Sequence, residues 1–428
     1  MLGWVSARVG IIVTGTEVIS GQIADRNGPW VSDRLLALGA EVPHLLQCGD
    51  RPADMTAQLQ FLADEGLDLI ITTGGLGPTA DDLTVATVAA FCGLGLDHDP
   101  QLADQITGII RDWRRYDDDE PLPENVRAAV DKQALVPAGA EPLRPAGTAP
   151  GLAIPAAAGR PAVLILPGPP HELQKMFGAA LSTAAVAAAL AGRESVRMAT
   201  LRAYGLSEAD LTATLESVAP SITGFTDLEI TTCIRAGELD VDVRYRETAD
   251  SAFAELKSAL LAEHGDQFFS PDGRRFDDLL SDALEGHSIA TAESCTGGMV
   301  AARITDRAGS SVYMLGGIVS YADEVKSGVL GVPADMIGDV GAVSKPVAAA
   351  MAEGARRVTG AKIGISTTGI AGPGGAVPGK PVGTVCFGLA VDGRPTETVT
   401  RQFPGDRAAV RTLATVYALH LVYDALTR

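Results

Sequence analysis

The last third of the chain carries residue types that could perform nucleophilic catalysis. Ser311 ends a Gly-Ser-Ser sequence, and Tyr321 and Lys326 follow it with four residues between them. A serine hydroxyl is a weak nucleophile until a base removes its proton, and a lysine in an apolar setting has a lowered pKa that suits this role. We therefore expect Lys326, with Tyr321 to relay or orient the proton, to activate Ser311. Coincidental spacing of three common residue types is the alternative.

Cys295, in the sequence Ala-Glu-Ser-Cys-Thr-Gly-Gly, is a rival nucleophile. This sequence joins a strand expected over residues 288–292 to a helix expected over 299–305, and a thiol at a helix N-terminus can have a lowered pKa. A small cysteine packed in the core is the alternative that its residue type favours. His287 and His420 lie outside the Gly-rich loops of this segment, which favours a Ser–Lys arrangement over Ser–His–Asp.

Features suited to phosphate binding accompany these residues. Thr368 and Gly369 belong to a glycine-rich loop after an apolar strand, where backbone N–H groups could donate to a phosphate or an oxyanion. Arg407 and Arg411 are four positions apart on the helix expected over 407–425, so their side chains share one face. They could clamp a phosphate, or they could form a solvated helix face that pairs with nearby acids.

A second group of candidate residues lies near the N-terminus. Gly74 and Gly75 follow an apolar strand expected over residues 68–73, and backbone N–H groups at such a turn can approach a phosphate closely. Asp81 and Asp82 come next and could hold a divalent metal ion against a pyrophosphate. The alternative is that one of these aspartates only caps the following helix.

Two further loops follow apolar strands in the same segment. One covers residues 15–27 after a strand expected over 9–14, and the other covers 166–173 after a strand expected over 163–166. Ligands of open α/β sheets bind outside the carboxyl ends of the parallel strands. We therefore expect all three loops to converge on one mouth, with His171 at a helix start and not acting as a base.

The elements around these motifs indicate the fold class. Helices expected over 27–38 and 55–63 separate the first three strands, which predicts a doubly wound, mostly parallel sheet. Residues 176–270 show the order β-α-β-β-α-β, which is typical of a small split βαβ unit. The sequence therefore predicts an α/β protein with a first domain over 1–175, a small α+β middle domain over 176–270 and an α/β domain over 271–428.

Composition limits the class of protein and its partners. Lys and Arg number 34 against 53 Asp and Glu, and the net charge of −19 argues against direct binding of nucleic acid or an anionic membrane. The five cysteines are far apart and form no Cys-x-x-Cys pair, as is typical of a reducing compartment. The N-terminus lacks the pattern of a secretion signal, so we expect a cytoplasmic protein.

Three motifs of the first segment together resemble the CinA family: Gly-Thr-Glu, Gly-Gly-Leu-Gly-Pro-Thr-Ala-Asp-Asp and Leu-Pro-Gly-Pro-Pro-His-Glu. The first segment of that family is similar to molybdopterin-binding domains, which implies the same fold here. The resemblance also implies an ADP-ribose pyrophosphatase that needs a divalent metal ion of unknown identity. By motif it makes Glu17, Asn27, Asp81 and Asp82 site residues, although turn chemistry is an alternative role for the first two.

The last segment resembles the CinA C-terminal domain, which also occurs alone as nicotinamide-nucleotide amidase. The motifs AESCTGG, GSS, Tyr-x4-Lys and TTGIAGPGG occur in the order of that family. The family hydrolyses the carboxamide of nicotinamide mononucleotide to nicotinic acid mononucleotide and ammonia, without a cofactor. The roles that the resemblance implies are nucleophile for Ser311, general base for Lys326, its partner for Tyr321, pocket positions for Ser294 and Thr368, and phosphate contact for Arg407 or Arg411.

We therefore expect an enzyme of pyridine-nucleotide salvage with an amidase site and a metal-dependent pyrophosphatase site. Its partners would be small nucleotides, nicotinamide mononucleotide and ADP-ribose, and we expect a homodimer. One alternative is a pyrophosphatase with a silent amidase domain. Another is a protein without catalytic activity that binds a nucleotide or a pterin and acts in competence or DNA damage.

Overall fold

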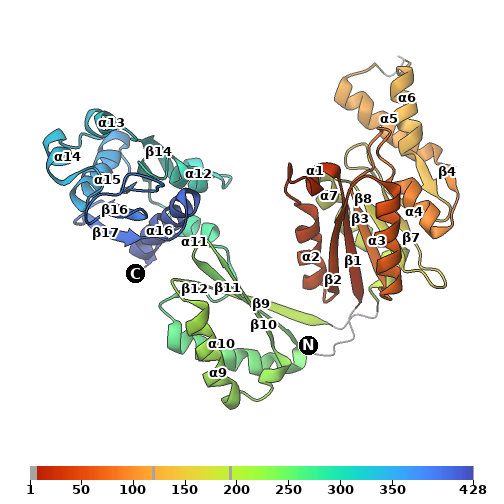
Figure 1. The fold of residues 1–428 in the computed structure, drawn as a ribbon, viewed down its shortest axis with the longest axis horizontal. Coiled ribbons are helices and arrows are strands. Elements are labelled where there is room, and N and C mark those ends of the chain that lie inside the picture. The colour runs from red at the N-terminus through yellow and green to blue at the C-terminus, as the bar shows by residue number, and fades with distance from the viewer. Residues whose placement is uncertain (1–6, 118–120, 192–194, 428) are drawn as a thin grey trace. The chain divides into compact units, whose positions relative to one another are not determined.

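The computed structural model describes residues 7–117, 121–191 and 195–427. The chain forms two compact units, which are Met1–Met198 with Arg244–Asp250 and Ala199–Val243 with Ser251–Arg428. Figure 1 shows that each of the three larger sheets carries its own helices. No described helix is long and apolar enough to cross a membrane.

The first unit contains a six-stranded sheet of β1 (Arg8–Thr14), β2 (Glu41–Cys48), β3 (Leu69–Thr73), β6 (Glu141–Leu143), β7 (Gly151–Ile154) and β8 (Ala162–Leu166). The strand order is β2-β1-β3-β8-β7-β6. The pairs β1–β2, β1–β3 and β3–β8 are parallel, whereas β7 and β6 run antiparallel. Every residue of β3 and β8 is buried, as expected for strands covered on both faces.

Helices cover both faces of this sheet, so the predicted doubly wound fold is confirmed. One face packs on α2 (Asn27–Ala37), α7 (Pro170–Leu181) and α8 (Ala184–Ala189), and the other on α3 (Pro52–Asp64) and α4 (Thr84–Cys92). Successive residues of β1 point to opposite faces of the sheet. Ile11 packs in the core on the α2 side, and Ile12 packs in the core on the α3 side.

An insertion that is mostly helical adds residues to the core on the α3 side of the sheet. It contains α5 (Pro100–Arg114), α6 (Glu124–Gln133) and a small ribbon of β4 (Leu96–His98) and β5 (Leu135–Pro137). Ile106 of α5 and Val130 of α6 are buried in this core.

The first unit extends beyond the expected limit at residue 175. That limit falls inside α7, and the unit continues through α8 to Met198. The physical reason is that Phe177 of α7 and Val186 of α8 are both buried in the core of the first sheet. A chain cut at 175 would expose this apolar surface.

The middle segment has the predicted β-α-β-β-α-β order. Its elements are β9 (Val196–Tyr204), α9 (Glu208–Val218), β10 (Glu229–Arg235), β11 (Glu238–Arg246), α10 (Asp250–His264) and β12 (Phe268–Ser270), and the sheet order is β10-β11-β9-β12. Ser207 begins α9 by accepting a hydrogen bond from the N–H of Asp210. The expected hairpin turn lies between β10 and β11.

The last segment forms a five-stranded sheet in the order β14-β13-β15-β16-β17. The strands are β13 (Ile289–Glu293), β14 (Met314–Val319), β15 (Ile363–Gly369), β16 (Thr384–Val391) and β17 (Glu397–Gln402). The pairs β13–β14 and β13–β15 are parallel, and β16 and β17 are antiparallel. The carboxyl ends of β13, β14 and β15 therefore meet at one edge of the sheet.

Helices cover both faces of this sheet as well. One core contains residues of α11 (Phe276–Ala283), α12 (Met299–Thr305) and the closing helix α16 (Arg407–Thr427), and a second core contains residues of α15 (Lys345–Thr359). The shorter α13 (Asp323–Gly328) and α14 (Ala334–Val340) connect β14 to α15.

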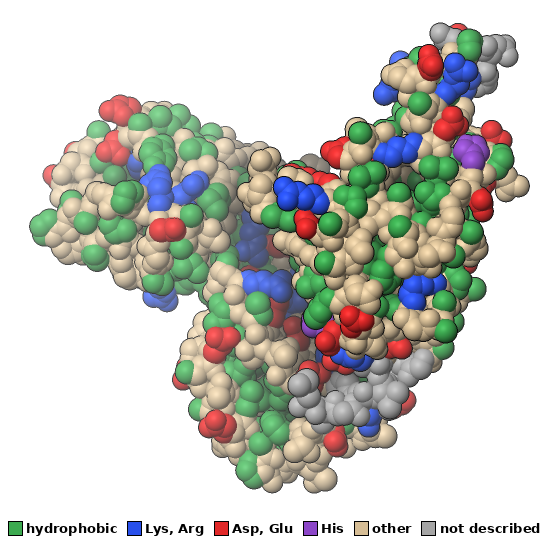
Figure 2. Space-filling model, turned by 45° about the vertical axis from the view of Figure 1, so that its right-hand side comes forward, with side chains coloured by type: hydrophobic (Ala, Val, Ile, Leu, Met, Phe, Trp, Pro, Cys, Tyr) green, Lys and Arg blue, Asp and Glu red, His purple; other side chains and the backbone are tan. Residues whose placement is uncertain are grey.

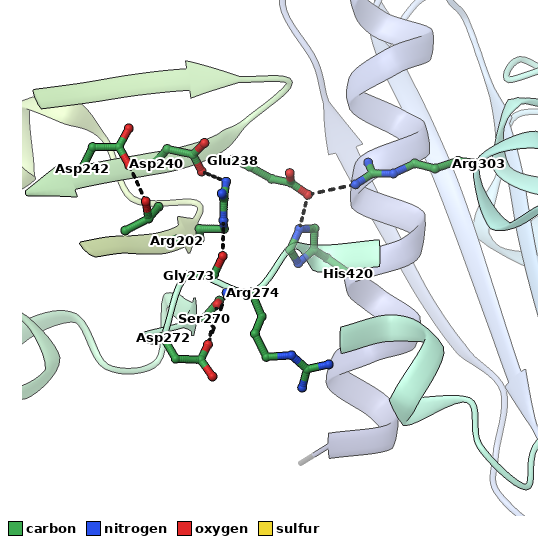
Figure 3. Close-up of polar contacts among 11 residues, drawn as sticks. Arg202, Glu238, Asp240, Asp242, Ser270, Asp272, Gly273, Arg274, Arg303 and His420 are labelled. Atoms are coloured by element: carbon green, nitrogen blue, oxygen red, sulfur yellow. Dashed lines mark hydrogen bonds and ion pairs between the residues drawn. The ribbon is translucent and has the colours of Figure 1, made fainter. Parts of the chain in front are cut away.

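A polar cluster joins the middle sheet to the last segment within the second unit (Figure 3). Glu238 of β11 accepts hydrogen bonds from His420 of α16 at 3.0 Å and from Arg303 of α12 at 3.3 Å. The ring of His420 stacks on Tyr204 of β9 with centroids 3.9 Å apart. The cluster is buried around His420, which is 3% exposed, so these polar groups depend on one another for hydrogen bonds.

Charged side chains are mixed on the surface. On the face drawn in Figure 2, Lys and Arg side chains lie in small groups among acidic and apolar ones. The basic side chains are therefore interspersed with acidic ones on this face, in a chain where Asp and Glu outnumber Lys and Arg.

Candidate functional site

The carboxyl edge of the C-terminal sheet assembles one candidate site. Ser294 follows β13 directly and donates its backbone N–H to the carbonyl of Thr367 on β15 at 2.8 Å. On the other side, the N–H of Ser320 donates to the carbonyl of Glu293 at 2.8 Å, in register with the β13–β14 pairing. Neighbouring strands lie about 4.8 Å apart, so Ser294 lies between the ends of β14 and β15.

A buried carboxylate shapes the loop that carries Ser294. Glu293, which is 1% exposed, ends β13 and accepts five hydrogen bonds. The donors are the hydroxyls of Thr291 and Thr296 and the backbone N–H groups of Gly298, Val300 and Ala301. Glu293 therefore satisfies the N-terminal N–H groups of α12. Sequence reasoning assigned it no role, although its place before a Gly-Gly turn and a helix was a usable signal.

Lys326 and Tyr321 meet at the same edge. Lys326 is buried, at 1% exposed, and its Nζ donates to the backbone carbonyl of Tyr321 at 3.2 Å and to the carboxylate of Asp323 at 3.0 Å. The phenol of Tyr321 is exposed and accepts a hydrogen bond from Arg407 at 2.7 Å. A buried amine, a phenol and a guanidinium group thus gather beside the strand end next to Ser294.

The two arginines of the closing helix have different environments. Arg407 is exposed and also donates to the carbonyl of Gly372 in the glycine-rich loop after β15, at 2.8 Å. Arg411 donates to the backbone carbonyls of Cys295 and Thr296 at 3.1 and 2.9 Å. Arg411 therefore holds the Ser294 loop, and Arg407 is the better placed of the two for contact with an anion.

Thr368 and Gly369 end β15 at the same edge. The hydroxyl of Thr368 is buried and donates to the carbonyl of Ala342 at 2.8 Å, which ties the strand end to the loop before α15. Thr368 thus lies at the same sheet edge as Ser294.

The structure does not bring Ser311 to this edge. Ser311 lies in the 3₁₀ turn Ser310–Val312, just before β14, whereas Tyr321 and Lys326 follow that strand. β14 is six residues long, and at about 3.3 Å per residue its ends are about 20 Å apart. The expected triad of Ser311, Tyr321 and Lys326 is therefore not formed in the chain. Ser294, predicted only as a pocket residue, lies at the same sheet edge as Lys326 and Tyr321.

Cys295 does not have the surroundings of a reactive thiol. It is 4% exposed and packs in the core with α12 and α16. Burial raises the pKa of Cys295 to about 12, so its thiol is protonated at neutral pH. The core-packing alternative therefore accounts for this residue.

The first unit contains a separate cavity of about 840 Å³ at the carboxyl ends of β1, β3 and β8. All three predicted loops contribute to its wall, and it includes the expected residues Glu17, Asn27, Gly74, Gly75, Asp81 and Asp82. Gly74 and Gly75 have positive φ angles of 106° and 63°. A Cβ at Gly74 would lie 2.4 Å from the carbonyl oxygen of Thr14, so the backbone of neighbouring strands comes close only because this residue is glycine.

Asn27 is fixed in the floor of this cavity. Its Nδ2 donates to the hydroxyl of Thr73 at 2.9 Å and to the carbonyl of Gly168 at 2.6 Å. The Thr73 hydroxyl donates in turn to the carbonyl of Pro167 at 2.8 Å, so it can only accept from Asn27. These contacts join the loops after β1, β3 and β8. The buried Oδ1 of Asn27 has no hydrogen-bond partner among the described residues.

Asp81 and Asp82 are both held by Thr79. The Thr79 hydroxyl lies within hydrogen-bond distance of both carboxylates and can donate its one proton to either, and its backbone N–H donates to Asp82 at 2.9 Å. The hydrogen bond from Thr79 lowers the pKa of Asp81, which keeps this carboxyl ionised at neutral pH.

These two carboxylates fit one mode of metal binding. No group of three or more His, Cys, Asp or Glu side chains suited to a metal comes together in the described part of the chain. Two carboxylates suit a Mg²⁺ ion that keeps several waters and takes further oxygens from substrate phosphates, but they do not suit a closed zinc site.

Comparison with known proteins agrees with this arrangement of two segments. Residues 276–426 match the CinA C-terminal domain, and residues 10–185 match the family described as a probable molybdopterin binding domain. The chain is 54% identical over 424 residues to a CinA-like protein of a Mycobacterium species, an alignment that covers 98% of this chain and 99% of that relative. The chain belongs to the CinA family. A CinA-like protein of Mycobacterium tuberculosis is 49% identical over 425 residues and covers 99% of this chain.

Solved CinA structures align with part of the chain. A competence or damage-inducible protein from Enterobacter asburiae is 34% identical, with a TM-score of 0.35, and the alignment covers 36% of this chain and 96% of that one. One candidate site lies within the segment that matches the CinA C-terminal domain, and the other lies within the segment that matches the probable molybdopterin binding domain.

Proposed function

We propose that the C-terminal segment hydrolyses the carboxamide of nicotinamide mononucleotide, with Ser294 as nucleophile in place of Ser311. The observation that carries this proposal is the convergence of Ser294, Lys326 and Tyr321 on the carboxyl edge of one sheet. The substrate class comes from the family resemblance. The CinA match supports the family of the chain, and the activity is our inference.

In the proposed reaction, the amine of Lys326 accepts the proton of the Ser294 hydroxyl. The serine oxygen then bonds to the carboxamide carbon, and the carbonyl π bond opens to give a tetrahedral oxyanion. Asp323, at 3.0 Å from the Lys326 amine, stabilises the ammonium form that results. Lys326 returns the proton to the leaving nitrogen, the C–N bond breaks and ammonia departs. Water then hydrolyses the acyl-serine and restores the Ser294 hydroxyl.

Arg407 supports the choice of a phosphorylated substrate. Its guanidinium group is exposed beside the phenol of Tyr321, and guanidinium groups bind phosphates with paired hydrogen bonds. We propose that Arg407 contacts the phosphate of the nucleotide and that Arg411 acts only by holding the loop of Ser294.

Ammonia release from nicotinamide mononucleotide tests the proposal. We expect Ser294→Ala and Lys326→Met each to reduce kcat by at least about 10³-fold, whereas the matched variant Ser311→Ala retains at least half of the activity. Loss of activity in Ser311→Ala with full activity in Ser294→Ala would reverse the assignment of the nucleophile. No ammonia from the unmodified protein would reject the amidase function.

A second function is favoured by the cavity of the first unit. We propose that this cavity binds ADP-ribose and that its residues cleave the pyrophosphate with the help of a divalent metal ion. The cavity wall has six carboxylates and, among its described residues, one basic side chain, Arg26. A pyrophosphate would be repelled by this wall without a bound cation. A metal ion held by Asp81 and Asp82 would neutralise phosphate charge and polarise the P–O bonds.

The double variant Asp81→Ala/Asp82→Ala tests this site. We expect it to lose metal-dependent release of AMP from ADP-ribose and to keep the amidase activity, because the two sites lie in different segments, over residues 10–185 and 276–426. A chelator should act in the same way on the unmodified protein. AMP release at the unmodified rate in the double variant would contradict the metal role of these aspartates.

A further inference from the structure

Glu172 is a buried carboxyl group in the wall of the N-terminal cavity. It lies in the first turn of α7, its side chain is 10% exposed, and it faces the cavity together with Asp81 and Asp82. The loop before β7 makes room for it, because a Cβ at Gly147 would lie 2.3 Å from the carboxyl carbon of Glu172. Glycine at 147 thus allows the carboxyl group to occupy this place.

Among the described residues, none donates to the oxygens of Glu172 the kind of hydrogen bond that holds other carboxylates of the cavity. Thr79 holds Asp81 and Asp82, and the backbone N–H groups that follow Asp25 hold that side chain. Within the described residues, the Glu172 Oε1 lies 3.9 Å from the Nε2 of His171, which is beyond hydrogen-bond distance. Its lone pairs are therefore available to a molecule in the cavity.

The cavity holds its carboxyl groups in two contrasting environments. Burial raises the pKa of Glu172, with a smaller opposing effect from His171 and Lys175, whereas the hydrogen bond from Thr79 lowers the pKa of Asp81. Carboxyl groups that are shifted in opposite directions within one site can take different roles. The ionised Asp81 suits a metal, and the more basic Glu172 suits proton transfer.

We propose that Glu172 is the general base of the N-terminal site and accepts a proton from the water that attacks the pyrophosphate. This inference rests on the pyrophosphatase function proposed above. The water oxygen forms a bond to one phosphorus, its proton passes to Glu172, and the bond from that phosphorus to the bridging oxygen breaks. The bridging oxygen leaves with the electron pair on the second phosphate, so ADP-ribose and water give AMP and ribose 5-phosphate.

Two other roles for Glu172 agree less well with the structure. A role as third metal ligand would require it to gather with Asp81 and Asp82, and no such group of three occurs among the described residues. A role in stability is also disfavoured, because a buried carboxylate without hydrogen bonds opposes folding. Removing its charge should therefore leave the melting temperature unchanged or raised.

Glu172→Gln tests the proposal, with Glu124→Gln as a matched control. Glu124 is an exposed glutamate that also lies in the first turn of a helix of this unit. We expect Glu172→Gln to lower kcat for AMP release by about 10²–10⁴-fold. Binding of α,β-methylene ADP-ribose, an analogue that cannot be hydrolysed, should stay within about threefold of the unmodified protein by calorimetry.

The pH profile supplies a readout that a structural role would not alter. In the unmodified protein, kcat should fall as the pH drops through the raised pKa of Glu172, and this dependence should be absent from the residual activity of Glu172→Gln. His171 and Lys175 on the same helix and the carboxylates of the cavity wall are the charged groups that influence this titration.

The outcomes separate the inference from the function on which it rests. Equal kcat values in Glu172→Gln and Glu124→Gln would overturn the role of Glu172 and leave the pyrophosphatase intact. A parallel loss of analogue binding and of kcat would also overturn it, because Glu172 would then act in binding. No AMP from the unmodified protein would overturn both proposals.

Discussion

Replacing Glu293 with glutamine would test whether one carboxylate holds the loop of Ser294. The carboxylate only accepts hydrogen bonds, and three of its five donors are backbone N–H groups whose direction is fixed by the helix start. An amide of almost the same shape offers one oxygen and one NH₂ group. Whichever way it turns, at least one backbone N–H must face the NH₂ group.

The size of the effect follows from these contacts. In the less costly orientation the amide oxygen serves Thr296, Gly298 and Val300, and the NH₂ group faces the N–H of Ala301 while the hydroxyl of Thr291 turns to accept. One buried N–H without an acceptor costs about 1–3 kcal/mol. Loss of the negative charge weakens each remaining backbone bond by about 1 kcal/mol. We expect Glu293→Gln to lower the free energy of unfolding by about 3–5 kcal/mol.

The tryptophans allow this loss to be assigned to one part of the chain. All three lie within the first 113 residues, so tryptophan fluorescence reports the first unit, whereas circular dichroism reports both. In Glu293→Gln, the denaturation followed by circular dichroism should gain an early transition that fluorescence does not show. Amidase activity should fall with it, and Glu285→Gln, an exposed substitution, should behave as the unmodified protein. A change below about 0.5 kcal/mol would refute the argument for this carboxylate.

Three further predictions concern the second unit. Burial lowers the pKa of His420 below its usual 6.5, so the folded chain binds this proton less well than the unfolded chain. The free energy of unfolding should therefore fall by up to about 1.4 kcal/mol per pH unit as the pH drops below 6.5. His420→Phe should flatten this slope in denaturation experiments. Iodoacetamide at pH 7.5 should modify the exposed Cys233 well before Cys295, as mass spectrometry of the peptides would show, and the reverse order would contradict the burial of Cys295. Arg411→Met removes both donors to the Ser294 loop and should lower kcat at least tenfold with little change in KM, whereas an equal loss through KM would indicate direct substrate contact.

The sequence predicts the sheets well because their strands are short apolar runs that end in glycine-rich loops. Leu69–Thr73 and Ala162–Leu166 are fully buried, and such strands have little freedom to form anything else. The sequence does not show where the first compact unit ends, because the alanine-rich helices after 175 carry no signal for the sheet against which they pack.

The error at Ser311 has a different origin. Ser311 precedes an apolar strand, whereas Ser294 and Tyr321 each follow one, and residues at opposite ends of parallel strands cannot meet. The order of Ser311, the strand and Tyr321 in the sequence was enough to predict this separation. The role of Glu172 could not be foreseen in the same way, because it depends on a contact with Gly147 that only the folded chain makes.

The position of Arg407 and Arg411 near the end of the chain bears on how the protein is made. These residues contact Tyr321, Cys295 and Thr296, which lie 86 to 116 positions earlier in the sequence. During synthesis, Ser294 and Lys326 leave the ribosome before the two arginines that orient their surroundings. A chain truncated just before Arg407 would therefore keep every residue of the proposed acyl transfer and lose the contacts that organise their surroundings.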